Sequence, residues 1–163
     1  RTNKRKELNI LKQTVSSIEK GKVSRREELE EYLLAISLQF FDQIKQYIPK
    51  IEIKWIDALA VSKIIDKLML FDQKTSFKIQ EFSKTLPSEL QPILDETYLL
   101  DLSRVEDPGK EWERVLFEIQ GMYVRAELKK LAAEIAEAEK KGEVIDALQA
   151  RFVDLSKSLN SPK

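Results

Sequence analysis

The sequence contains no cysteine and no histidine among its 163 residues. Nearly all zinc sites use one or both of these residues, and thiol and Ser-His-Asp nucleophiles also require them, so these classes of site are excluded. The di-iron sites of helical bundles also need histidine, so the many carboxylates are best interpreted as solvated helix faces. The lack of cysteine agrees with a reducing compartment, and we expect a cytoplasmic protein.

Glycine and long apolar runs are also scarce. The four glycines are isolated from one another, so no glycine-rich phosphate loop is present. No apolar run approaches the roughly 20 residues that cross a bilayer, and no signal peptide is evident, so no membrane partner is expected. Trp55 and Trp112 are assigned to the core. Three glutamates, Glu134, Glu137 and Glu139, are expected to pair with Lys130, Lys140 and Lys141. We therefore predict no catalytic, cofactor-binding or metal-binding residue.

The formal net charge is zero, but the first segment is strongly basic. We interpret residues 1–23 as a basic linker helix. A nucleic-acid contact is the alternative, and it is disfavoured because no aromatic residues or glycines interleave with the charges. Because the first residue is Arg1, we expect the chain to be a piece of a longer protein.

Residues 24–123 have the pattern of a helical body. Ser24 and Glu27 form a capping box that starts a helix with apolar side chains nearly all round, so this helix is expected at the centre. Asp57 and Ser88 are predicted caps of later helices, residues 51–55 an extended connection, and 72–76 a turn. Three leucines are expected to close the base of the body: Leu99, Leu100 and Leu102. The prediction is an all-α body of about six helices.

A long helix and a helical hairpin are predicted after the body. Asp107 and Pro108 suit a helix start, and Gly142 suits a stop, after which residues 144–159 form a second helix. Folding the chain back at Gly142 pairs two apolar rows: Val124, Leu128, Leu131, Ile135 and Ala138 with Leu159, Leu155, Phe152, Leu148 and Ile145. We predict an antiparallel hairpin over residues 124–159 that protrudes from the body, and a loose tail over 160–163.

The face of this hairpin away from the seam is the best candidate for function. It offers small side chains, which let another helix approach closely, with charges at the rim. An alanine-rich surface also arises simply because alanine favours helix, and the two interpretations have about equal weight. The predicted partner-binding residues are Lys140, Lys141, Glu143, Val144, Ala147, Ala150, Arg151, Val153 and Asp154.

Residues 24–159 resemble the C-terminal domain of bacterial DnaG-type DNA primases. The likeness lies in the helix start at residues 26–39, in residues 106–108 followed by Trp112 and Leu116, and in the hairpin that turns at residues 140–142. It implies a non-catalytic module that docks, mainly through the hairpin, on the N-terminal domains of the DnaB-type replicative helicase. The parent would be a primase, a DNA-directed RNA polymerase of the replisome whose zinc-binding and polymerase domains lie elsewhere.

Two other functions stay open at this point. The chain also has the outline expected of the helicase N-terminal domain itself, or of a helical scaffold or adaptor. Hairpins on long helices also exchange between chains at high concentration, which makes a hairpin-swapped dimer a further form to consider.

Overall fold

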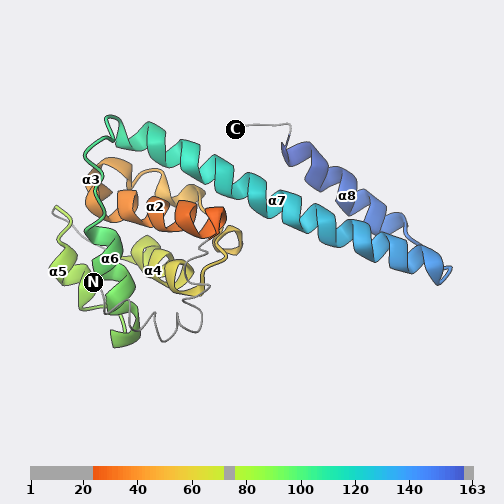
Figure 1. Ribbon diagram of the computed structural model, residues 1–163, viewed down its shortest axis with the longest axis horizontal. Helices are drawn as coiled ribbons and strands as arrows, with labels where there is room; N and C mark the ends of the chain where they lie inside the picture. The colour runs from red at the N-terminus through yellow and green to blue at the C-terminus, as the bar shows by residue number, and fades with distance from the viewer. Residues whose placement is uncertain (1–23, 72–75, 160–163) are drawn as a thin grey trace.

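The computed structural model describes residues 24–71 and 76–159, and all of the regular structure in these ranges is helical (Figure 1). The predicted linker helix 1–23, most of the predicted turn 72–76 and the tail 160–163 lie outside the described residues. The all-α prediction is confirmed. The elements in chain order are α2 (Arg25–Gln39), α3 (Phe41–Ile44), η1 (Ile48–Lys50), η2 (Ile53–Trp55), α4 (Leu59–Leu70), α5 (Ile79–Ser83), η3 (Ser88–Leu90), α6 (Gln91–Tyr98), α7 (Pro108–Lys140) and α8 (Asp146–Leu159).

Helix α2 lies at the centre of the body, which comprises residues 24–71 and 76–123. The Ser24 hydroxyl accepts from the Glu27 amide at 3.0 Å, and the Ser24 amide donates to the Glu27 carboxylate at 3.4 Å, which is the predicted capping box. Beyond the first turn the helix is buried on every side except at a few positions, and it packs against α4, α6 and α7. Such a distribution is stable only in the middle of a bundle.

Trp112 connects α7 to the centre of this core. Its side chain is fully buried, and the indole Nε1 donates to the Ser37 hydroxyl at 2.9 Å. That hydroxyl donates in turn to the Leu33 carbonyl at 2.8 Å, so the polar atoms brought into the core are paired. Trp55 is also buried, and the assignment of both tryptophans to the core is confirmed.

Glu30 is a fully buried carboxylate that the sequence pattern did not single out. It accepts from the backbone amides of Asp57 at 2.7 Å and Ala58 at 2.8 Å, and Arg26 Nε donates to it at 3.2 Å. The Arg26 guanidinium also donates to the Trp55 carbonyl at 2.8 Å. The predicted Asp57 cap is therefore wrong: α4 starts after Ala58, and the acceptor for these amides comes from α2.

Two other local predictions were also wrong. Ser88 does not cap a helix: residues Ser88–Leu90 form η3, and α6 starts at Gln91. This start places Pro92 in the first turn, where a missing amide hydrogen is tolerated. Residues 51–55 are not simply extended, because 53–55 form the 3₁₀ turn η2, whose Trp55 amide donates to the Glu52 carbonyl at 2.9 Å. This bond pairs a backbone amide and a carbonyl that have no neighbouring strand to bind.

The base of the body also differs from the expectation. Only Leu102 is buried, whereas Leu99 is 77% exposed and Leu100 is 41% exposed. Helix α6 ends at Tyr98, and the Gln39 amide nitrogen donates to the carbonyls of Thr97 and Leu100. The turn is therefore held to α2 through its backbone while its leucines face solvent.

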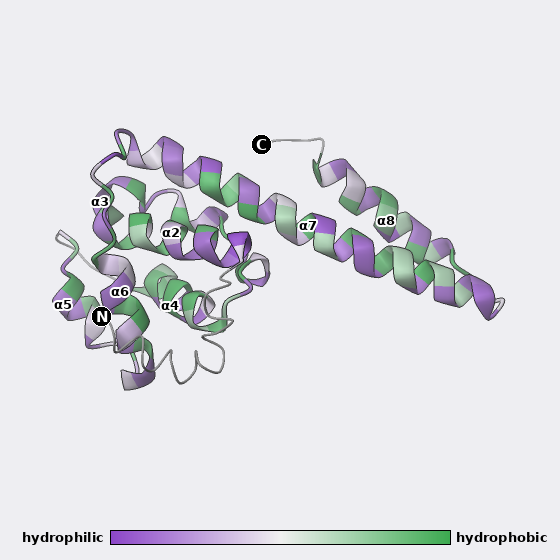
Figure 2. Ribbon diagram, viewed as in Figure 1, coloured by the Kyte–Doolittle hydropathy of each residue, from purple (hydrophilic) through white to green (hydrophobic). Residues whose placement is uncertain are grey.

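Helix α7 extends well beyond the body, and α8 runs back along its second half (Figure 1). Its 33 residues correspond to a rod roughly 50 Å long. Apolar and polar residues are interspersed along both helices (Figure 2). Within the described ranges, every helix is too short or too polar to cross a membrane.

Removing the Glu30 carboxylate should strongly destabilise the body. Glu30→Ala leaves two partly buried backbone amides and a partly buried guanidinium without their acceptor, and a loss of roughly 3 kcal/mol in the free energy of unfolding is expected. Urea denaturation followed by circular dichroism measures this loss. The matched control is Glu28→Ala on the exposed side of the same helix, for which a change within about 0.5 kcal/mol is expected. Equal losses in the two variants would refute the role assigned to Glu30.

Candidate interaction surface

The turn between α7 and α8 is built by the backbone around Gly142. The Glu143 amide donates to the Ala138 carbonyl at 2.9 Å, and the Gly142 amide donates to the Glu139 carbonyl at 3.1 Å. These two bonds form a Schellman motif, which needs a left-handed residue at the position of Gly142. Gly142 has a φ of +73°, so the predicted stop occurs at this residue. Helix α8 starts at Asp146, two residues later than predicted, and Val144 lies in the connection.

The seam between α7 and α8 is narrow. On α7, Val124, Leu131 and Ala138 are buried, while Leu128 and Ile135 are partly buried. On α8 no residue is fully buried. The facing row, which begins just before α8, is partly buried throughout: Ile145, Leu148, Phe152, Leu155 and Leu159. The free energy gained from such partial burial is small against the entropy lost in ordering the helix. The hairpin (residues 124–159) therefore depends on the body at its root.

The nine residues predicted to bind a partner are all exposed. Val144 is 84% exposed and Val153 is 52% exposed, and Ala147 and Ala150 lie between them in sequence. The five charged members make no ion pair within the described part of the chain: Lys140, Lys141, Glu143, Arg151 and Asp154. The structure thus presents apolar and small side chains with charged neighbours on α8 and its preceding turn. We call these nine residues the hairpin surface.

The expected pairing of Glu134, Glu137 and Glu139 with nearby lysines was wrong. All three carboxylates are exposed, and Lys130 instead pairs with Glu127 at 3.1 Å. An i,i+3 pair of this kind on a solvated surface contributes little stability, so several alternative pairings have nearly equal free energy. No group of three or more acidic residues in the described ranges is placed to hold a metal ion.

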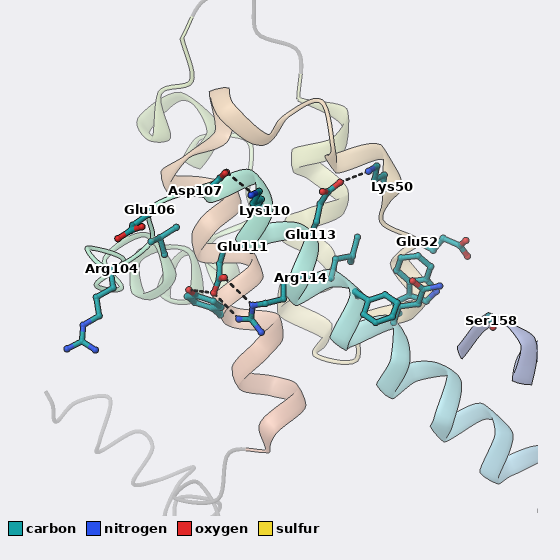
Figure 3. A pocket seen from close by; sticks show the side chains of 16 residues that line it. Lys50, Glu52, Arg104, Glu106, Asp107, Lys110, Glu111, Glu113, Arg114 and Ser158 are labelled. Atoms are coloured by element: carbon teal, nitrogen blue, oxygen red, sulfur yellow. Dashed lines mark hydrogen bonds and ion pairs between the residues drawn. The ribbon is translucent and has the colours of Figure 1, made fainter. Parts of the chain in front are cut away.

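A cleft of about 1320 Å³ lies at the root of α7 and reaches Ser158 near the end of α8 (Figure 3). Phe117, which is 46% exposed, contributes an aromatic ring to it. The other lining side chains are mostly charged, and several are paired: Arg114 with Glu111 at 2.8 Å and Lys50 with Glu113. Sequence reasoning did not identify this cleft, because its walls come from α2, η1, η2, the loop before α7, the first half of α7 and the end of α8.

A hydrogen-bonded group at one edge of the cleft joins α2 to α7. The Tyr32 hydroxyl donates to Glu111 at 2.8 Å, and Arg114 binds both Glu111 and Glu118. The hydrogen bond from Arg114, followed by that from Tyr32, holds the pKa of Glu111 below its usual value. Burial, followed by the hydrogen bond to Glu111, raises the pKa of Tyr32 to about 12. At neutral pH Glu111 therefore stays ionised and Tyr32 stays protonated. The two groups stabilise the fold and do not exchange protons at that pH.

The i,i+3 and i,i+4 spacing of Glu111, Arg114 and Glu118 is visible in the sequence and could have revealed that part of the group. The contribution of Tyr32, 79 residues away from Glu111, has no such signal.

Comparison with known proteins finds no matching family model, curated protein or solved structure.

The Tyr32–Glu111 contact should make stability depend on alkaline pH. The unfolded chain loses the phenol proton near pH 10, whereas folded Tyr32 keeps it to about pH 12. The folded state holds the extra proton between these values, so the free energy of unfolding should fall as the pH rises through them. Urea denaturation at a series of pH values from 9 to 12 measures the fall.

Tyr32→Phe should flatten this fall, because no proton is lost at that position in either state. The matched control is Tyr98→Phe, which removes the hydroxyl of a more exposed tyrosine and should keep the wild-type slope. A slope that Tyr32→Phe leaves unchanged would contradict the assignment.

Proposed function

We propose that this chain is a protein-interaction domain whose hairpin surface binds a partner, and that it is the C-terminal, helicase-binding domain of a bacterial DNA primase. Its partner would be the N-terminal domains of the DnaB-type replicative helicase. In this role the domain carries out no catalysis itself. It holds the primase's polymerase domain beside the unwound strand, which raises the effective concentration of that domain there.

The observation that carries the interaction function is the position and composition of the hairpin surface. Val144 lies in the connection after α7 and Val153 lies in α8; both are exposed, and Ala147 and Ala150 lie between them in sequence. Helix α8 runs along the part of α7 that extends beyond the body (Figure 1). Exposed valines cost free energy in water, and covering them contributes about 25 cal/mol per Å² of buried apolar area. Ala147 and Ala150 have no side chain beyond Cβ, so a partner helix is able to approach the α8 backbone closely.

The charged residues of the hairpin surface support a selective contact. None of its five charged side chains is neutralised within the described part of the chain, so each is available to a complementary charge on a partner. Charges at the rim of an interface stay partly hydrated, and they therefore guide association at little desolvation cost. The mixture of signs, with Lys140 and Lys141 near Glu143 and with Arg151 near Asp154, favours a protein partner over a uniformly anionic polymer.

The particular assignment to primase is supported by the resemblance over residues 24–159. The arrangement of an all-helical body followed by a long helix and a returning helix agrees with what that resemblance implies. The runner-up, the N-terminal domain of the helicase, predicts binding to a primase domain in place of binding to the helicase. A scaffold unrelated to replication predicts binding to neither protein.

Binding to the helicase N-terminal domain tests this function directly. Isothermal titration calorimetry with that purified domain should detect a complex, and Ala150→Glu should weaken it at least roughly thirtyfold. This factor corresponds to the roughly 2 kcal/mol expected when a charge is placed in the centre of an interface. Circular dichroism should show an unchanged helix content, because residue 150 is exposed.

Ala133→Glu is the matched control. It makes the same change at an exposed alanine in the second half of α7, outside the hairpin surface, and it should leave the affinity within about threefold of the wild type. Absence of binding by the wild-type chain would overturn the primase assignment. Equal weakening by both substitutions would overturn the assignment of binding to the α8 side of the hairpin.

A further inference from the structure

The sequence of residues 1–23 combines an apolar stripe with a strong positive charge. Its apolar side chains recur at alternating spacings of three and four residues: Leu8, Leu11, Val15 and Ile18. A helix would place all four on one side. The same segment holds seven basic and two acidic residues, a net charge of +5, and because the whole chain is neutral, residues 24–163 carry the balancing charge of −5. A segment of this kind buries its stripe best on an apolar surface with acidic surroundings.

A groove of about 420 Å³ with an apolar lining lies on the body beside the start of α2. Leu29, Tyr32 and Leu100 contribute this lining. Leu29 is buried, whereas Leu100 is 41% exposed in the turn that follows α6, and its neighbour Leu99 is 77% exposed. Both exposed leucines leave apolar surface in water, and covering that surface is favourable.

Acidic side chains surround this groove. Glu28 and Glu31 line it from α2, and Glu111 lines it from α7. Three further exposed carboxylates lie close in sequence to the exposed leucines: Asp95, Glu96 and Asp101. The positive segment and this surface therefore have opposite charges, which favours their association.

The two arginines that line the groove do not reverse its charge. Arg25 pairs with Glu118 at 3.4 Å, and Arg114 pairs with Glu111 at 2.8 Å and with Glu118 at 3.2 Å. Each guanidinium thus already faces a carboxylate. A basic segment is attracted to such a groove, and an acidic peptide is repelled.

The segment joins the described body at this groove. Ser24 is the cap of α2, and the next residue, Arg25, lines the groove. Ile18 lies six positions before Ser24 in the sequence, and six extended residues span at most about 20 Å. The stripe is thus tethered beside the groove, so its effective concentration there exceeds that of a separate molecule.

We propose that residues 3–20 pack on this groove as a helix, with the apolar stripe over Leu100 and the basic side chains near the surrounding carboxylates. The occupant of the groove is this chain's own N-terminal segment, which becomes part of the body by covering its exposed apolar surface. This inference concerns the chain alone and does not rest on the proposed function.

Hydrogen–deuterium exchange of the full chain, followed by mass spectrometry, tests the docking. Amides of residues 3–20 should exchange at least about tenfold more slowly than in a synthetic peptide of residues 1–23, because an isolated helix of this length is marginal in water. Leu100→Lys removes apolar surface from the groove and adds a positive charge, so it should bring exchange to within about threefold of the peptide. Exchange of residues 33–38 in α2, measured in the same spectra, reports that the body stays folded.

Val153→Lys is the matched control, because it makes the same kind of change at a 52% exposed position on α8, away from the groove. It should leave the protection of residues 3–20 unchanged. The stripe supplies a second matched pair. Leu11→Gln removes one of its side chains and should speed exchange at least about fivefold, whereas Ile10→Gln, outside the stripe, should change it less than about twofold.

Equal effects of the two lysine substitutions, or of the two glutamine substitutions, would overturn the proposal. Protection that grows with protein concentration would overturn it in favour of a second copy of the chain in the groove. Protection that arises only after the helicase N-terminal domain or a single-stranded oligonucleotide is added would overturn it in favour of that partner.

Discussion

Helix α7 has to pack against two different partners along one continuous backbone, and the rest of the structure depends on this constraint. Its first half completes the core of the body, with Trp112 hydrogen-bonded to Ser37 of α2. Its second half is covered on one side by α8. The packing changes between Tyr123, which still packs against the core of the body, and Val124, which is buried outside that core. A single secondary-structure element thereby joins a buried globular core to an exposed arm.

The two ends of this helix differ in how firmly they are held. The body has a fully buried centre, and its polar atoms are paired across elements, as Glu30 shows by accepting from Asp57 and Ala58. The hairpin has only one narrow seam, in which no residue of α8 is fully buried. An arm of this kind exposes small and apolar side chains at little structural cost, and it is suited to gain further stability by binding. This difference in packing is the physical basis for placing function in the hairpin and not in the body.

The proposed primase role and the proposed interaction surface rest on different features of the chain. The likeness concerns the order of helices and a few apolar and capping residues, which describe a fold. The hairpin surface consists of nine exposed side chains, which the fold does not need. Residues that are dispensable for folding are free to be selected for binding, so the proposed contact is placed on these exposed side chains.

The sequence by itself determined the features that depend on neighbouring residues. Ser24 with Glu27, Asp107 with Pro108, and Gly142 mark helix ends through hydrogen bonds that span only a few positions. The apolar rows of α7 and α8 follow from helical periodicity in the same way. Only the tertiary structure decided that Glu30 supplies the acceptor at the start of α4, that Tyr32 donates to Glu111, and that Leu99 faces solvent. These features join residues far apart in the chain, or depend on which surfaces other helices cover, and local spacing carries no information on either.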